Sequence, residues 1–321
     1  MAAERSTLTG ERVLDRIGLS VRVHQRIGSG GGDVNAAVLD HFGLTEANRL
    51  GSGWESSIYA LNPTQILRIP NPEPEVEVRV RARAAFTAGL PVMPFDVPRV
   101  REIKYVAGVL VAIEDRIAGR ALVEMLPELT GERRRRALAA YLDTAEAMAA
   151  MTTDGDYGDL LVPEPLRCAH WGEYLAKRLE GFAADEVLAS AVPGYAEKVA
   201  RLTARLLALP DPEKRIVHGD IWPPNVMLDE GLRVTGLIDF SVTTRVGDTV
   251  MDLAGAVQYI RIGNPNAAED FGYLMGLIEA RHGATLRELL GLYGVWIAFS
   301  WAYNHDEPVV YPWCLAMIRG F

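Results

Sequence analysis

The sequence has few cysteines and no apolar run long enough to span a membrane. Its two cysteines, Cys168 and Cys314, are far apart and match no metal-ligand spacing, so we expect free or buried thiols in a reducing compartment, the cytoplasm. Residues 1–17 carry charges throughout, so we expect no secretory signal. The most apolar segment, 289–303, is shorter than the roughly 18–20 residues of a transmembrane helix, which indicates a core helix.

Basic residues are also outnumbered. The chain has 33 Lys and Arg against 42 Asp and Glu, a net charge of −9. Nucleic acids are bound by clustered cations, so we expect no nucleic-acid partner. Without a long apolar run we also expect no membrane partner. The excess of acidic residues favours a cationic or metal-bound ligand. The composition, 49% hydrophobic and 23% charged, is that of a globular protein, and 321 residues suffice for two lobes.

A glycine run at 28–32 lacks the Lys-Ser/Thr pair of a P-loop and the spaced glycines of a dinucleotide fold. We therefore interpret residues 1–32 as an N-terminal extension that contains a flexible joint. A short amphipathic helix, 34–43, follows and ends at a glycine.

Residues 33–117 have the texture of a small sheet-rich lobe. A glycine turn at 51–53 leads into a strand, the turn residues Asn62-Pro63-Thr64 close it, and a second strand ends near residue 69. A helix is expected over 75–88, and one buried strand over 106–117.

Residues 118–321 have a mainly helical texture. The helical patterns cover 132–151, 195–209, 251–261, 267–281 and 286–302. One β-like island interrupts them, from Arg215 to Phe240, and it carries a cluster of polar residues. The pattern predicts an α+β protein with an antiparallel-sheet N-lobe and a mainly helical C-lobe.

The polar residues of this island suit phosphoryl transfer. Asp220 follows His-Gly, Asn225 comes five residues later, and Asp239 comes after a short hairpin. Phosphoryl transfer needs cations that bridge the phosphates, oxygen ligands that hold those cations, and a group that orients the attacking hydroxyl. Asn225 and Asp239 offer oxygen ligands for Mg²⁺, and Asp220 can accept the proton of the hydroxyl. A His-Gly-Asp turn alone commonly only satisfies its own backbone; the two further residues favour catalysis.

These residues resemble the signature of the aminoglycoside phosphotransferase and small-molecule kinase family. That signature is His-Gly-Asp, four residues, Asn, and later Ile-Asp-Phe, which reads here as 218–225 and 237–240. The resemblance extends from about residue 33 to the C-terminus. It implies a bilobal protein-kinase-like fold, with Asp220 as the catalytic residue and Asn225 and Asp239 as ligands of Mg²⁺. It also implies ATP or GTP as co-substrate.

The resemblance further implies phosphate-binding residues in the N-lobe. The glycine turn offers small residues whose backbone N–H groups can approach the phosphates, namely Gly51, Ser52, Gly53 and Ser57, although the same residues could serve only as a hairpin turn.

Arg68 stands where most kinases have a lysine on the third strand. Its glutamate partner is expected on the next helix, as Glu77 rather than Glu75. The segment that links the lobes, from Glu114 to Ile117, is implied to hydrogen-bond the nucleotide base through its backbone. His218 is interpreted as a structural histidine.

The resemblance places the acceptor site among the C-terminal helices. There Trp301, Asp306 and Glu307 are candidates for contact with a hydroxylated cation, although ordinary helix packing also explains the aromatic residues of this region. We expect the acceptor to be a small molecule such as an aminoglycoside, a macrolide or a basic peptide antibiotic. The sequence does not indicate an oligomeric state.

Two other functions stay open. A metabolic kinase of the same architecture would act on a sugar, fructosamine, choline or homoserine; the segment Ser241–Thr244 lacks the acidic and aromatic character expected of fructosamine kinases. A non-catalytic nucleotide-binding relative would have lost one of its three polar residues, and Asp220, Asn225 and Asp239 are all present. Only eight residues separate Asp239 from Asp248, too few for the long activation loop of a regulated protein kinase.

Overall fold

The computed structural model describes residues 31–52 and 55–321. Within that part of the chain the main helices are α2 (Gly31–His41), α3 (Val76–Gly89), α4 (Leu122–Met125), α5 (Gly131–Ala147), α6 (Trp171–Phe182), α7 (Glu186–Ala191), α8 (Tyr195–Leu207), α9 (Val250–Tyr259), α10 (Ala267–His282), α11 (Leu286–Trp301) and α12 (Val310–Gly320). The strands are β1 (Arg49–Ser52), β2 (Ser56–Asn62), β3 (Gln65–Pro70), β4 (Val100–Val106), β5 (Val109–Asp115), β6 (Arg120–Ala121), β7 (Tyr157–Asp159), β8 (Arg167–Cys168), β9 (Arg215–Val217), β10 (Val226–Leu228), β11 (Val234–Leu237) and β12 (Arg245–Gly247).

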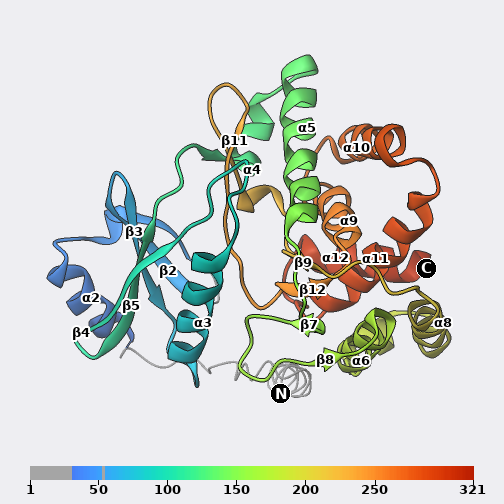
Figure 1. Ribbon diagram of the computed structural model, residues 1–321, viewed down its shortest axis with the longest axis horizontal. Coiled ribbons are helices and arrows are strands. Elements are labelled where there is room, and N and C mark those ends of the chain that lie inside the picture. Colours follow the sequence, from blue (N-terminus) through green and yellow to red (C-terminus); the bar gives the residue numbers. More distant parts are fainter. Residues whose placement is uncertain (1–30, 53–54) are drawn as a thin grey trace.

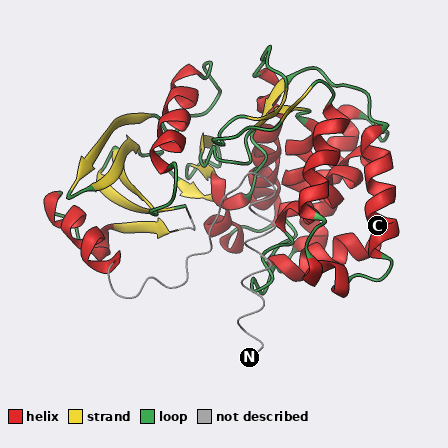
Figure 2. Cartoon of the chain, turned by 90° about the horizontal axis from the view of Figure 1, so that it is seen from below, coloured by secondary structure: helices red, strands yellow, loops and turns green. Residues whose placement is uncertain are grey.

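The first strands form one antiparallel sheet in the order β1-β2-β3-β5-β4, and most of the helices gather in the other half of the molecule (Figures 1 and 2). Side chains alternate between the two faces of a strand, so each face of this sheet needs its own cover. Val38 and Leu39 of α2 belong to the cluster on one face, and Val80 of α3 packs with Leu110 and Ala112 on the other. The α+β fold predicted from the sequence is confirmed.

One predicted element is wrong. The apolar run 106–117, expected as a single strand, is divided by a tight turn between β4 and β5. Ala107 and Gly108 form this turn with φ of 50° and 79°, the left-handed conformation that two-residue hairpin turns require. The segment from Val109 to Ile113 is apolar without alternation because β5 is buried on both faces, so its pattern did not separate it from the end of β4.

The second half of the chain is built around buried helices. α11 has nine buried residues distributed around its whole circumference, as the apolar pattern predicted. Its Trp296 donates a hydrogen bond from Nε1 to the carbonyl oxygen of Leu175 in α6, at 3.0 Å, which satisfies the one polar atom of that buried ring. Helices α6 and α12 were not predicted, although both carry buried apolar residues.

Short strands inside this helical half carry the polar island. β10 pairs with β11 and with β6, and β12 pairs with β7 and β9. The ends of β9 and β11 therefore bring residues 218–225 and 238–241 to one place, at the junction with the sheet of the first half (Figure 1).

Two further expectations concern the cysteines and the apolar segments of the chain. Cys168 and Cys314 are both buried and free, as predicted. Across residues 31–52 and 55–321, we find no helix with the length and apolar character needed to cross a bilayer. The glycine run falls largely outside the described residues; Gly31 and Gly32, its last members, begin α2.

Candidate active site

The loop that carries Asp220 is anchored by a buried carboxylate. Asp252, in the first turn of α9, is 1% exposed and accepts hydrogen bonds from the backbone N–H groups of His218 (3.0 Å) and Gly219 (2.8 Å). The hydroxyl of Tyr141 donates to the carbonyl oxygen of Ile221 at 2.6 Å on the far side of Asp220. The loop is thereby held on both sides of the residue predicted to be catalytic, which the sequence did not indicate.

Gly219 is required by this loop geometry. Its φ is 79°, and a Cβ atom there would lie 2.3 Å from the carbonyl oxygen of Thr243. We expect Gly219→Ala to lower the free energy of unfolding by about 2–5 kcal/mol, because a left-handed backbone costs about 1–2 kcal/mol and an overpacked contact about 1–3 kcal/mol. Urea denaturation measures this. Gly276→Ala, on α10 with nothing within 4 Å of its added Cβ, is the control, and an equal effect of the two substitutions would contradict the argument.

Asp220 is buried beside Asn225. The Asn225 side chain donates from Nδ2 to Asp220 Oδ2 (2.9 Å) and to the Asp220 carbonyl oxygen (3.0 Å). The other carboxylate oxygen of Asp220, Oδ1, is buried without a hydrogen-bond partner among the described residues. Burial, and then the negative charge of Asp239, raise the pKa of Asp220 to about 8. A carboxylate with a free oxygen and a pKa near neutrality is suited to accept a proton from a hydroxyl.

Backbone contacts bring Asp239 to the same place. The N–H of Ile238 donates to the carbonyl oxygen of Asn225 at 2.9 Å, which joins the catalytic loop to the end of β11. Asp239 follows with φ of 70°, partly exposed. Within the part of the chain that the structure describes, its carboxylate has no hydrogen bond or ion pair. The three residues that the sequence singled out therefore lie together.

His218 holds these two segments together. Its Nε2 lies 3.1 Å from the carbonyl oxygen of Ile238, and its Nδ1 accepts the N–H of Asp220 at 3.2 Å. Complete burial lowers the pKa of His218 to about 4, so the ring is neutral at physiological pH and donates from Nε2. The structural interpretation of this histidine is confirmed.

The predicted partner of Arg68 is wrong. Arg68 Nε donates to Glu114 of β5 at 2.9 Å, and Arg68 Nη1 donates to the hydroxyl of Ser56 at 2.8 Å. Glu77 lies on the exposed side of α3 and pairs with Arg81 (2.6 Å) and with the hydroxyl of Tyr105 (2.7 Å). The physical reason is the register of the sheet, which sets Ile66 and Arg68 of β3 opposite Glu114 and Ala112 of β5.

The predicted glycine turn, residues 51–53, is only partly described, and its first two residues belong to β1. Gly51 and Ser52 pair with Ile58 and Ser57 across the hairpin, while Gly53 lies outside the described residues. The hydroxyl of Ser57 accepts a hydrogen bond from Arg49 at 3.4 Å, whereas Ser56, on the opposite face of β2, faces Arg68. The serine whose side chain contacts Arg68 is therefore Ser56, which was not among the predicted phosphate-binding residues.

The linker between the lobes begins after β5. Glu114 lies inside the sheet between Ile66 and Val100, and its carboxylate is only 2% exposed because it pairs with arginine side chains. Ile117 lies beyond the strand end, and its side chain packs directly on Gly236 of β11. Of the two ends of the segment predicted to bind the base, Ile117 thus lies against the β10–β11 hairpin, whereas the side chain of Glu114 forms ion pairs with arginines.

The residues predicted to contact the acceptor lie in two different environments. Trp301 donates from Nε1 to the hydroxyl of Tyr259 at 2.8 Å, and the pKa of Tyr259 is raised by burial and then by the charge of Asp220. The ring of Tyr259 lies 6.4 Å, centroid to centroid, from that of Trp222 in the loop 218–225, so Tyr259 stands between Trp301 and that loop. Asp306 and Glu307 are exposed, in the turn between α11 and α12.

Comparison with known proteins agrees with this geometry. A family model described as the phosphotransferase enzyme family, APH, matches residues 46–289. A thermostable mutant of aminoglycoside phosphotransferase APH(4)-Ia in its apo form superimposes with a TM-score of 0.65 at 18% identity, over 89% of this chain and 99% of that one. The GDP complex of aminoglycoside 2'-phosphotransferase-IIIa gives 0.62 at 13% identity, over 91% and 98%. No curated protein matches the chain.

The family match spans most of the chain, and the two superpositions establish the same protein-kinase-like fold. The chain therefore belongs to the phosphotransferase enzyme family. It is a kinase whose phosphoryl acceptor is an alcohol group.

Proposed function

We propose that this protein transfers the γ-phosphate of ATP or GTP to a hydroxyl group of a small, cationic molecule, in the presence of Mg²⁺. The observation that carries the proposal is the convergence of Asp220, Asn225 and Asp239 at one junction, with Asp220 Oδ1 buried and without a hydrogen-bond partner among the described residues. A buried polar atom without a partner is rare in a folded protein, and a free carboxylate oxygen can accept a hydrogen bond from an incoming hydroxyl.

Each of the three residues has a distinct part in the mechanism. Asp220 accepts the hydrogen bond of the acceptor hydroxyl at Oδ1 and takes its proton as the oxygen attacks the γ-phosphorus. The bond between this phosphorus and the oxygen that bridges it to the β-phosphate breaks, and ADP or GDP leaves. Asn225 holds the Asp220 carboxylate in place through the 2.9 Å bond to Oδ2. Most of the rate enhancement in phosphoryl transfer comes from such positioning and from charge stabilisation.

The donor set fits Mg²⁺. Asn225 Oδ1 and the Asp239 carboxylate would hold the ion, which when bound would neutralise negative charge on the nucleotide phosphates. The described residues contain no cluster of three or more His, Cys, Asp or Glu side chains that could hold a metal. Mg²⁺ sites of kinases commonly have only one or two protein carboxylates, because phosphate oxygens and waters complete them.

The acceptor class is proposed from charge and from the related structures. The chain carries a net charge of −9, and Asp306 and Glu307 are exposed after the helix that carries Trp301. The solved relatives include APH(4)-Ia with ADP and hygromycin B, and APH(2")-IIIa with GDP and kanamycin. We propose an aminoglycoside or a macrolide or basic peptide antibiotic, a cytoplasmic location, and lobes that meet at residues 117–118.

A coupled assay of nucleotide consumption tests the proposal. Purified protein is given Mg·ATP or Mg·GTP with single acceptors, namely aminoglycosides, macrolides, basic cyclic peptides, choline, homoserine and a fructosamine. We expect acceptor-dependent ADP or GDP release with at least one cationic antibiotic. Turnover confined to the metabolic acceptors would contradict the acceptor class, and nucleotide binding without turnover of any acceptor would contradict the activity.

Removing Asp239 tests the metal assignment. We expect Asp239→Ala to weaken the binding of ADP in the presence of Mg²⁺ by about tenfold or more, because a carboxylate ligand of the bridging ion is lost. Binding of ADP in the presence of EDTA is expected to change little. Isothermal titration with and without Mg²⁺ measures both values, and equal affinity of variant and wild type in Mg²⁺ would contradict the assignment.

A further inference from the structure

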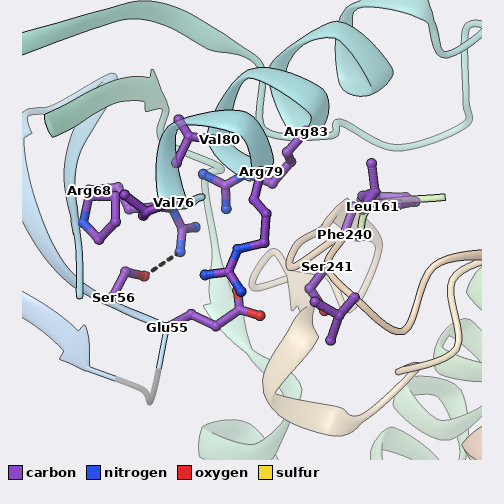
Figure 3. Close-up of a pocket in the computed structure, with 12 residues that line it drawn as sticks. Glu55, Ser56, Arg68, Val76, Arg79, Val80, Arg83, Leu161, Phe240 and Ser241 are labelled. Carbon is purple, nitrogen blue, oxygen red and sulfur yellow. Dashed lines mark hydrogen bonds between the residues drawn. The ribbon is translucent and has the colours of Figure 1, made fainter. Parts of the chain in front are cut away.

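A cavity between α3, the strands β2 and β3 and the segment after Asp239 is lined by three arginines. Arg68 comes from β3, while Arg79 and Arg83 are one helical turn apart on α3 and point into the same cavity (Figure 3). Among the described residues that line the cavity, Glu55 carries the only carboxylate, and Figure 3 shows it beside the head group of Arg79. Arg81, on the same helix, faces solvent.

The ion pairs around this cavity leave one positive charge unmatched. Arg68 and Arg83 share a single partner, the deeply buried Glu114, so one carboxylate serves two guanidinium groups. Arg79 is paired with Glu73. Among the described residues, these three arginines and two glutamates sum to one positive charge. Two further carboxylates act on the arginines: Glu55, which lines the cavity, and Asp239, which comes just before the lining residues Phe240 and Ser241. Burial and the negative charge of Asp239 raise the pKa of Glu55, whereas the positive charges of the three arginines lower it. Both effects are expected for a buried carboxylate that lies close to Asp239 and to the arginines.

We propose that Arg79 and Arg83, together with Arg68, form the binding site for the nucleotide phosphates, and that Glu55 occupies this site until the nucleotide displaces it. The inference rests on the proposed function and adds two positioning residues and an internal competitor to it. Guanidinium groups match phosphate oxygens with two parallel hydrogen bonds. A terminal phosphate carries more negative charge than a carboxylate, so the exchange favours the nucleotide. The resemblance predicted a glutamate on this helix; arginine faces the cavity instead.

The experiment separates phosphate contacts from base contacts. The dissociation constants of ADP and of adenosine are measured in EDTA for the wild type, Arg79→Gln and Arg81→Gln; GDP and guanosine replace them if the wild type prefers guanine. We expect Arg79→Gln to weaken ADP about tenfold, the loss of one charge-assisted contact, and to leave adenosine unchanged. Arg81→Gln is the matched control and should change neither.

Glu55 gives an arm of opposite sign. We expect Glu55→Gln to tighten ADP several-fold, because the competing charge is gone, and to leave adenosine unchanged. Arg79→Lys, which keeps the charge, should recover part of the ADP affinity if Arg79→Gln proves unstable in a thermal scan.

Three outcomes overturn the inference. Equal ADP affinity in Arg79→Gln and Arg81→Gln would exclude Arg79 from the phosphate site. Unchanged or weaker ADP binding in Glu55→Gln would exclude the competition. If these two results are found while the wild type binds ADP and transfers phosphate, the inference is wrong and the proposed function still holds. If the wild type binds neither ADP nor GDP, both the proposed function and the inference are wrong.

Discussion

Asp220→Asn is expected to lower kcat by about 10³–10⁴-fold while the dissociation constant of ADP stays within about threefold. The substitution keeps the shape of the side chain but removes the proton acceptor, and general-base catalysis with correct orientation of the nucleophile accounts for a rate factor of this size. The nucleotide is held by other residues, so its binding is preserved. Asp220→Ala should give the same division between turnover and binding.

Steady-state kinetics with the acceptor found in the screen, together with titration of ADP, measure this prediction. Asp229→Asn is the matched control, since Asp229 lies in the turn of the β10–β11 hairpin that follows the Asp220 loop and pairs with Arg233. Turnover of Asp220→Asn within tenfold of the wild type would remove Asp220 from the mechanism. A loss of ADP binding as large as the loss of turnover would show that the substitution disrupts the fold of the loop instead.

Asp252→Ala is expected to lower the free energy of unfolding by about 2–6 kcal/mol and kcat by about 100-fold or more. The carboxylate accepts two backbone N–H groups of the catalytic loop, at 3.0 and 2.8 Å, and each buried donor left without a partner costs about 1–3 kcal/mol. The loop then loses the contact that positions Asp220, and a displacement of about 1 Å can reduce the rate about 100-fold.

Asp252→Asn tests the same contact more gently. Its amide oxygen can still accept one of the two hydrogen bonds, so about half of the loss in stability is expected. Urea denaturation and kcat are measured on both variants. An Asp252→Ala protein with wild-type stability would contradict the anchoring role, and wild-type turnover in a destabilised variant would show that anchoring does not position Asp220.

The arrangement of the catalytic residues could be predicted because they are close in sequence. Asp220 and Asn225 lie in one loop, and the hairpin of β10 and β11 returns the chain directly to Asp239. A hairpin places its two ends side by side whatever the rest of the fold does. Order and residue type were therefore sufficient to expect two carboxylates and an amide in one place.

The charged lining of the cavity beside α3 could not be predicted in the same way. Apolar and charged residues alternate along the sequence of α3, so no periodicity shows which side faces the sheet. Glu77 was chosen because it lies in the helix, yet helical phase places it beside Arg81 in solvent and turns Arg79 and Arg83 inward. Glu114, the actual partner of Arg68, is 46 residues away in the sequence.

The amino-acid sequence by itself thus determined the class of fold, the longer helices and the grouping of Asp220, Asn225 and Asp239, because each depends on patterns or contacts between residues that are close in the sequence. The tertiary structure alone decided which ions pair with Arg68, which face of α3 meets the cavity, and that Asp252 holds the catalytic loop. Ion pairs and buried hydrogen bonds depend on strand register and helix packing between distant segments, and local sequence patterns do not encode these.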